Sequence, residues 1–181
     1  MGSITLRVPK GISGAVRERD AEFTEFFRAE YPGLVRTLYL VTRDREQARD
    51  IAQEAFIQLF ARWWRISHYD RPEAWVRRVG IRMAVRASKR EQIRPRLERE
   101  LDFATFPKPV DLDVLRAIRE LPSSQRAAVA LFYLEDRPVS EVAEILGCSE
   151  MTAKVHLHRG RKRLAEMLGE KELIGETEDV P

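Results

Sequence analysis

The chain has 181 residues, of which 44% are hydrophobic and 34% charged, and its formal net charge is +3. This composition is sufficient for one or two small packed domains and excludes wholesale disorder. The single cysteine excludes a disulfide framework, and no apolar run approaches the roughly 18 residues of a membrane span. The first residues also lack the pattern of a secretory signal peptide. We therefore expect a cytoplasmic protein with no membrane insertion.

The first part of the chain, residues 20–93, shows the periodicity of a small helical domain. Residues 1–19 are expected to form a flexible arm, and helical spacing begins near Asp20 and is expected to be interrupted at Pro32-Gly33. Asp44 is placed to cap the strongest helix, whose apolar residues recur at steps of three and four. That stripe consists of Ala48, Ile51, Ala52, Ala55, Phe56, Leu59, Phe60 and Trp63.

A helix with one apolar and one basic face follows the loop from Ser67 to Pro72. Pro72 suits the first turn of that helix. Between Arg77 and Arg96 there are eight basic residues against one acid, an asymmetry that indicates a polyanionic partner. A solvated charged face is the alternative. The basic positions spaced along this face are Arg78, Arg82, Arg86 and Lys89.

Aromatic residues flank the loop that precedes the basic face. Trp63 and Trp75 are expected in the core, whereas Trp64, His68 and Tyr69 are expected at the surface. Aromatic rings beside cations can stack single-stranded bases while the cations hold the backbone.

The second part of the chain begins after a segment, residues 94–110, that has mixed charge and no sustained period and that we interpret as a flexible linker. Residues 111–168 again have helical periodicity, with Ser123 or Ser124 and then Ser140 as expected helix caps. The remaining residues, 169–181, form an acidic tail.

Residues 139–164 predict two helices around a tight turn. Gly147 fits the left-handed position that ends the first helix, and Ser149 can cap the second. The second helix is basic and is expected to bury Ala153, Leu157, Leu164 and Leu168. This is the pattern of a helix-turn-helix, whose second helix reads the major groove. Two packed helices with a solvated charged face remain the alternative.

These segments together resemble one known family. "RDREQARDIAQEAFIQLFARWWRI", "RPEAWVRRVGIRMAVRASKR" and "LPSSQRAAVALFYLEDRPVSEVAEILGCSEMTAKVHLHRGRKRL" occur in the order and spacing of an extracytoplasmic-function (group IV) sigma factor of the sigma-70 family. The resemblance covers about residues 20–168. It implies an all-α fold of two small helical domains, σ2 (20–93) and σ4 (111–168), joined by the linker.

The resemblance also implies partners and contact residues. The partners are core RNA polymerase, through its β and β′ subunits, and promoter DNA, with an anti-sigma factor as a further candidate; no cofactor and no catalysis are implied. Polymerase contact falls on Asp50, Gln53, Glu54 and Phe56. Contact with the −10 element falls on Trp64, Ser67, His68, Tyr69, Arg78, Arg82, Arg86 and Lys89. Contact with the −35 element falls on Ser149, Glu150, Met151, Lys154, Val155, His156, His158 and Arg159.

Two departures from the family pattern change what is expected. Arg82 stands where members commonly have Asn, and a long Arg would more naturally reach a phosphate than a base. Val155-His156 stand where Ser-Arg is frequent, which leaves Val155 available to a thymine methyl. A stand-alone helix-turn-helix repressor or activator is the rival function, but it leaves the first domain's arginine and aromatic residues unexplained.

Overall fold

The computed structural model describes residues 10–91 and 111–169, with side chains described from residue 17 to 89 and from 111 to 169. The predicted linker (94–110), the acidic tail beyond Gly169 and the first nine residues lie outside these ranges. Every regular element within them is a helix, which confirms the all-α prediction. No helix in the described ranges is both long and apolar enough to cross a membrane.

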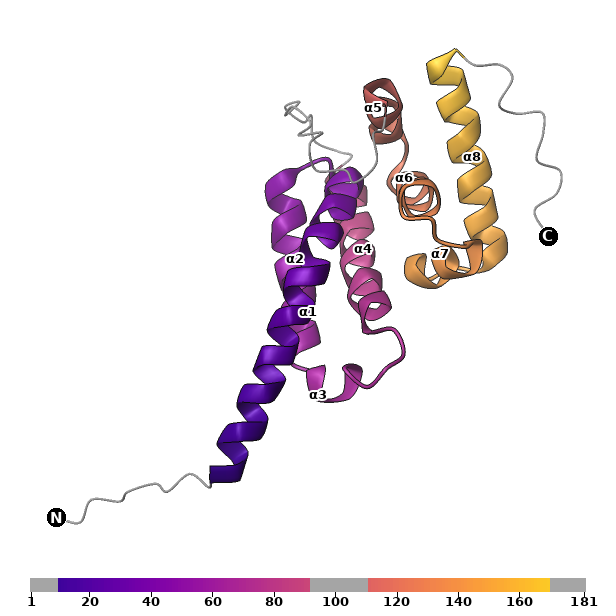
Figure 1. Ribbon diagram of the computed structural model, residues 1–181. Coiled ribbons are helices and arrows are strands. Elements are labelled where there is room, and N and C mark those ends of the chain that lie inside the picture. Colours follow the sequence, from indigo (N-terminus) through magenta and orange to yellow (C-terminus); the bar gives the residue numbers. More distant parts are fainter. Residues whose placement is uncertain (1–9, 92–110, 170–181) are drawn as a thin grey trace.

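The first domain is built from three longer helices and one short turn of helix (Figure 1). These are α1 (Lys10–Thr42), α2 (Arg45–Phe60), α3 (Trp63–Ile66) and α4 (Pro72–Glu91). Asp44 caps α2 as predicted, because its Oδ1 accepts a hydrogen bond of 3.0 Å from the Gln47 N–H. The predicted stripe is buried except for Phe60, and its part on α2 faces α1 and α4; α2 ends at Phe60, so the last stripe residue, Trp63, lies on α3.

Two predicted boundaries are wrong: α1 neither begins near Asp20 nor breaks at Pro32. It starts at Lys10, inside the expected flexible arm, and runs unbroken to Thr42. A proline inside a helix removes a backbone donor and costs about 3 kcal/mol in isolation. Here the helix is packed on both sides of Pro32, since Tyr31 lies 5.9 Å from the Phe56 ring and Leu34 is fully buried. Tertiary packing therefore offsets the local cost.

The second domain consists of four short elements and one longer helix, α8, that pack against one another (Figure 1). They are α5 (Leu112–Glu120), α6 (Ser123–Val129), the π-helix η2 (Ala130–Leu134), α7 (Val139–Leu146) and α8 (Glu150–Leu168). The expected serine caps of α6 and α7 are absent. Pro122 and Pro138 occupy those N-cap positions instead, and their extended backbones lead directly into the helices.

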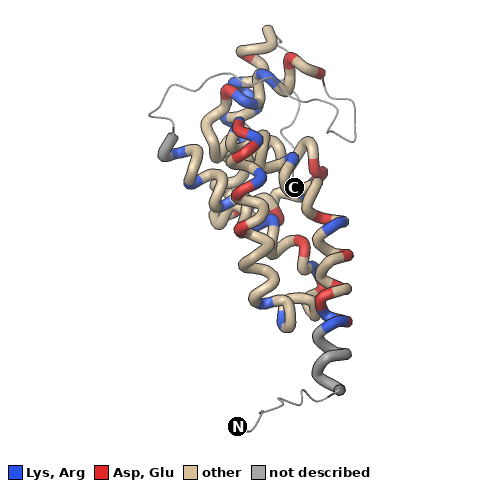
Figure 2. Tube along the Cα trace, turned by 90° about the vertical axis from the view of Figure 1, so that its left-hand side faces the viewer, with Lys and Arg blue, Asp and Glu red and all other residues tan. Residues whose placement is uncertain are grey.

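The two domains pack against each other. Helix α4 of the first domain lies against α6 and α7 of the second, and α1 lies against α6. Buried residues of both domains belong to one hydrophobic cluster, from Leu34 and Leu38 through Val76 to Leu131 and Val142. Acidic and basic residues are intermixed along the helices (Figure 2). In the described part of the chain the two domains are therefore in direct contact. The sequence indicates two domains and a linker, but it does not indicate this contact.

Candidate nucleic-acid interface

The turn between α7 and α8 has the predicted geometry. Gly147 adopts a left-handed conformation with φ 71°, and its N–H donates to the Glu144 carbonyl at 3.2 Å. The N–H of Cys148 donates to the Ala143 carbonyl at 3.0 Å. These two bonds satisfy carbonyls that the end of a helix leaves unpaired, and glycine adopts the required φ without strain. Burial raises the pKa of the Cys148 thiol.

Ser149 caps the second helix of the motif, also as predicted. Its Oγ accepts a hydrogen bond of 3.2 Å from the Thr152 N–H. The buried face of α8 differs from the expected one, since Ala153 and Leu157 are buried but Leu164 and Leu168 are only half-buried. Helix α8 instead approaches α6 most closely at Gly160, where an added Cβ would lie 2.8 Å from Cγ2 of Val129. In the sequence, a glycine at position 160 within the amphipathic pattern of this helix was the feature that indicates a close helix contact.

The outer face of α8 presents most of the residues expected to contact the −35 element. Met151 is 70% exposed and Val155 38%. Two of the expected residues, Lys154 and His156, are half-buried. Burial, followed by the positive charges of Lys89 and Arg159, lowers the pKa of His156 below its ordinary value. The exposed members of the set are Ser149, Glu150, Met151, Val155, His158 and Arg159.

The expected polymerase-binding surface on α2 is exposed except at one position. Asp50, Gln53 and Glu54 all reach solvent. Phe56 does not belong to this surface, because it is only 2% exposed and its ring packs among aromatic residues of α1. The position of Phe56 in the apolar stripe of α2 already indicates, in the sequence, that its side chain is buried. Ile57, which the sequence interpretation missed, is 64% exposed beside the acidic residues.

The ring-bearing residues near the loop divide as predicted at four positions. Trp63 is buried, whereas Trp64 and Tyr69 are 65% and 44% exposed. His68 is exposed, and its Nδ1 lies 3.1 Å from Oγ of Ser67. Trp75 is only partly buried, in contrast to the expected core position.

The basic face of α4 is split between solvent and the second domain. Arg86 and Lys89 are exposed, but Arg78 pairs with Glu144 at 3.0 Å. Arg82 donates from Nη2 to the Glu144 carbonyl at 2.8 Å and from Nε to the Ile145 carbonyl at 3.1 Å. The guanidinium expected to contact a phosphate therefore lies at the C-terminal end of α7 in this arrangement.

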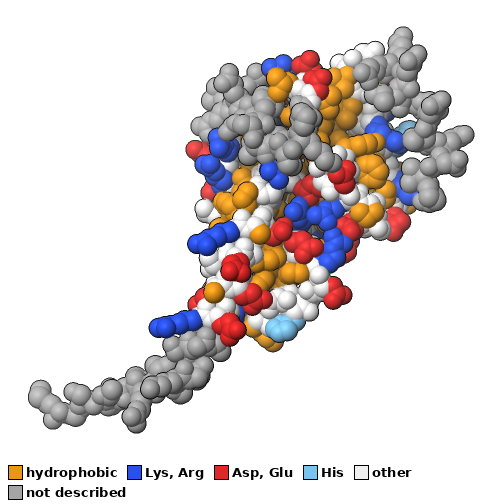
Figure 3. Space-filling view, in the orientation of Figure 1, with side chains coloured by type: hydrophobic (Ala, Val, Ile, Leu, Met, Phe, Trp, Pro, Cys, Tyr) orange, Lys and Arg blue, Asp and Glu red, His pale blue; other side chains and the backbone are white. Residues whose placement is uncertain are grey.

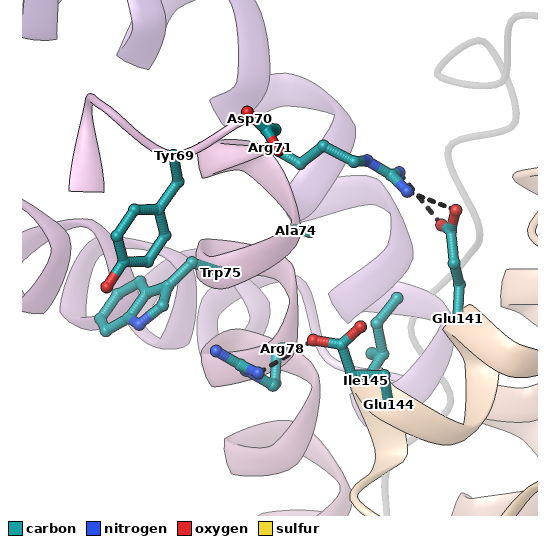
Figure 4. A pocket seen from close by; sticks show the side chains of 9 residues that line it. All are labelled: Tyr69, Asp70, Arg71, Ala74, Trp75, Arg78, Glu141, Glu144 and Ile145. Carbon is teal, nitrogen blue, oxygen red and sulfur yellow. Dashed lines mark hydrogen bonds and ion pairs between the residues drawn. The ribbon is translucent and has the colours of Figure 1, made fainter.

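A pocket of about 390 Å³ lies between the loop, α4 and α7 (Figure 4). Tyr69 and Trp75 form one wall, and Arg71 and Arg78 reach across to carboxylates of α7. In the space-filling view, Lys and Arg side chains gather beside Asp and Glu side chains at the junction of the domains (Figure 3). Within the described ranges, no cluster of three or more His, Cys, Asp or Glu side chains could hold a metal ion.

Comparison with known proteins accounts for both halves of this arrangement. Residues 26–93 match the family described as Sigma-70 region 2, and residues 111–164 match Sigma-70, region 4. The RNA polymerase sigma-E factor of Streptomyces coelicolor is 31% identical over 157 residues, which are 84% of this chain and 89% of the relative. The ECF RNA polymerase sigma factor SigM of Mycobacterium tuberculosis is 26% identical over 81% of this chain and 77% of its own length.

A solved structure shares the fold. The sigma factor RpoE of Bartonella quintana, crystallised with the anti-sigma factor NepR, superposes with a TM-score of 0.65 at 21% identity over 82% of this chain and 97% of that one. A match to region 2 as well as region 4 accounts for the first domain, which a stand-alone helix-turn-helix regulator leaves unexplained. The chain belongs to the extracytoplasmic-function sigma factors of the sigma-70 family, which bind core RNA polymerase and direct transcription initiation at promoters.

Proposed function

We propose that this sigma factor acts without catalysis of its own and divides promoter recognition between its domains. Residues 26–93 hold core polymerase and open the −10 element, and residues 111–164 read the −35 element as duplex DNA. The observation that carries this division is the α7–α8 motif, in which both predicted local signals, Gly147 and Ser149, produce a second helix with an exposed outer face.

The polymerase contact is assigned to the exposed flank of α2. Asp50, Gln53 and Glu54 share this flank with the exposed side chain of Ile57. Carboxylates can pair with arginines of a partner helix while an apolar side chain supplies buried area at the centre of the contact. Asp50→Arg with Gln53→Ala should weaken binding in a pull-down with core polymerase and leave the melting temperature unchanged. Glu166→Arg, at an exposed position of α8, is the control, and unchanged affinity of the α2 variant would refute the assignment.

The −10 contact is assigned to the loop and to the cations that stay exposed on α4. Tyr69 and Trp64 offer exposed rings for unstacked bases, and Arg86 and Lys89 can hold the backbone. A phosphate contact adds binding energy regardless of sequence, whereas a base contact discriminates by about 1–3 kcal/mol. Exchange of the loop from Ser67 to Pro72 should therefore shift the preferred −10 base, and Arg86→Ala should slow opening on every template alike. Permanganate reactivity of unpaired thymines on −10 variants separates the two results.

The −35 contact is assigned to the outer face of α8. Arg159 and His158 are exposed cationic or polar positions, and Val155 and Met151 are exposed apolar ones that suit thymine methyl groups. Arg159→Ala should reduce transcription from promoters with a −35 element, by about 1–3 kcal/mol if it contacts a base. If it contacts a phosphate, affinity should fall for all sequences and the salt dependence should weaken.

Run-off transcription with purified core polymerase tests the whole proposal. We expect promoter-specific transcripts only when the chain and core polymerase are both present, and promoter protection that depends on core polymerase. Protection of a palindromic duplex by the chain alone would instead favour a stand-alone regulator.

Because a structural relative was crystallised with an anti-sigma factor, we also propose such a protein as a partner of this chain. We place the action of the sigma factor itself in the cytoplasm.

A further inference from the structure

The outward side of α8 carries one row of exposed side chains along its whole length. Residues four apart lie on the same face of a helix, so side chains at steps of four form a continuous row. Apolar side chains stand at both ends of this row and two arginines stand at its centre. The row, which we call the outer stripe of α8, consists of the exposed residues Met151, Val155, Arg159, Arg163 and Met167.

The positive charge at the centre of the outer stripe is not compensated within the second domain. Lys162 adds a third exposed cation beside the two arginines. In the described part of the chain no carboxylate pairs with Arg159, Lys162 or Arg163, although Glu166 lies on the same side of the helix. Arg163 donates to Oε1 of Gln125 at 3.3 Å, and this amide oxygen carries no net charge. Such a surface attracts a polyanion.

The acidic tail that follows α8 has the complementary chemistry. Residues 170–181, which lie outside the described ranges, contain five acids and one lysine. Read from its C-terminal end, the outer stripe has one apolar residue, then two arginines and then two apolar residues. Read from Gly169, the tail has an apolar pair, then three acids and then a valine, namely Leu173, Ile174, Glu176, Glu178, Asp179 and Val180. The two orders match, with the charges opposite in sign.

The length of the tail is sufficient for it to lie along the outer stripe. Gly169 ends α8 with φ 74°, a left-handed conformation that turns the chain out of the helix. Arg159 precedes Gly169 by ten residues, which is about 15 Å along a helix. The acids at 176–179 follow Gly169 by seven to ten residues, over which an extended chain spans about 23–33 Å. The acids can therefore reach both arginines.

We propose that residues 170–181 fold back on the outer stripe of α8 and compete with duplex DNA for its arginines. The inference rests on the proposed −35 role of α8. The carboxylates of the tail substitute for phosphates, because a guanidinium forms the same charge-assisted hydrogen bonds with both. Exposed ion pairs are individually weak, so DNA can displace the tail. The covalent connection nevertheless keeps the acids at an effective concentration on the order of millimolar.

The consequence of this contact is a lower affinity of the chain for all duplex DNA. The tail must leave the outer stripe before any duplex can occupy it. Apparent affinity for promoter and for unrelated DNA should therefore fall by the same factor, which is the fraction of molecules with an uncovered stripe. Non-specific binding depends on contacts between cations and phosphates, so the tail limits the binding of the chain to DNA that carries no promoter.

The first test locates the tail by paramagnetic relaxation in the full chain. A spin label is attached at Thr177→Cys in a Cys148→Ser background. We expect the label to broaden the backbone amides of residues 155–167 on α8 and to leave those of α2, in the other domain, unchanged. A spin-labelled chain mixed with an isotope-labelled chain without the spin label is the control for contact between molecules, and it should broaden none. Absence of broadening on α8, equal broadening on α2, or broadening only in the mixture would overturn the inference.

The second test measures affinity for a fluorescent −35 duplex without polymerase. Glu176→Gln and Glu178→Gln with Asp179→Asn should make the chain bind about tenfold more tightly if roughly a tenth of the unaltered chain is uncovered. A duplex of unrelated sequence should show the same gain. The matched control removes the same charge from exposed positions of α1, by Glu18→Gln, Glu22→Gln and Glu25→Gln. Equal gains in both chains would overturn the inference, because general electrostatic attraction would then explain them.

The inference and the −35 role of α8 fail separately. If Arg159→Ala leaves the affinity of the holoenzyme for the −35 element unchanged, the −35 role is refuted and the competition with it. If Arg159→Ala weakens that affinity but the altered tail gains nothing over its control, the −35 role stands and the competition is refuted. The relaxation measurement involves no DNA, so it decides by itself whether the tail lies on α8.

Discussion

Gly147 offers the sharpest test of how the two domains are joined, because one substitution acts on both the backbone and the contact. Its φ of 71° is a conformation that costs an L-residue roughly 1–2 kcal/mol. In Gly147→Ala the new Cβ would also lie 2.7 Å from Arg82 Nη2. Displacement of Arg82 would break two charge-assisted hydrogen bonds, which in this partly exposed site we take as about 1–2 kcal/mol in total. The variant should therefore lose about 2–4 kcal/mol of unfolding free energy.

The two contributions can be separated with one matched control and one double variant. Gly169 ends α8 with φ 74°, and a Cβ there would meet no atom within 4 Å, so Gly169→Ala reports the backbone cost alone. In an Arg82→Ala background the clash is absent, and Gly147→Ala should cost only the backbone amount. Urea unfolding followed by circular dichroism gives the four free energies of the cycle, and we expect a coupling of about 1–2 kcal/mol.

Two results would refute this reasoning. In the first, Gly147→Ala and Gly169→Ala lose the same free energy, which would mean that Arg82 moves aside without cost. In the second, the losses of Gly147→Ala and Arg82→Ala simply add in the double variant, which would mean that the guanidinium is not held at the end of α7 in solution.

Three further predictions concern single side chains. Phe56→Ala should lower the free energy of unfolding by about 3–5 kcal/mol in a denaturant titration, because it leaves a cavity in the aromatic core, and a folded variant that loses only polymerase binding would contradict its burial. Ser149→Ala should lower the stability by about 1 kcal/mol in the same titration while Ser149→Asp should not, since the aspartate also caps α8; equal losses would argue against the cap. The pKa of His156 is lowered in the folded chain by burial and by Lys89 and Arg159, so stability is fully present above about pH 6.5 and should fall as the pH drops below it; His156→Asn should flatten that dependence in melting curves between pH 5 and 8, and an unchanged slope would contradict the burial of the imidazole.

Interactions within one helical turn could be predicted from the sequence. Asp44, Gly147 and Ser149 act on backbone groups within a few residues of themselves, and their roles in capping and turning the chain are confirmed. The stripe of α2 was likewise predicted, because helical spacing alone determines which side chains share a face. The helical character, the helix-turn-helix and the resemblance to the family all depend on signals of this local kind.

The serine caps expected for α6 and α7 were a local misprediction, since the neighbouring prolines hold those positions, but two other mispredicted features depend on residues distant in the sequence. Pro32 predicts the end of a helix because a proline inside a helix costs free energy locally. Only the packing of α1 against α2 explains why the helix continues through it. Phe56 was assigned to the polymerase surface by resemblance, and its aromatic neighbours on α1 remove it from that surface.

The tertiary structure alone decided what the arginines of α4 contact. Their spacing in the sequence indicates one cationic face, and a cationic face attracts any anion that fits it. Glu141 and Glu144 lie more than 60 residues away from their partners, and nothing in either segment indicates that the two would meet. Arg82 is matched to backbone carbonyls, which have no sequence signature at all. The sequence by itself determined the helices, the turn and the charge of this face; the packing of α4 on α7 determined which groups that charge contacts.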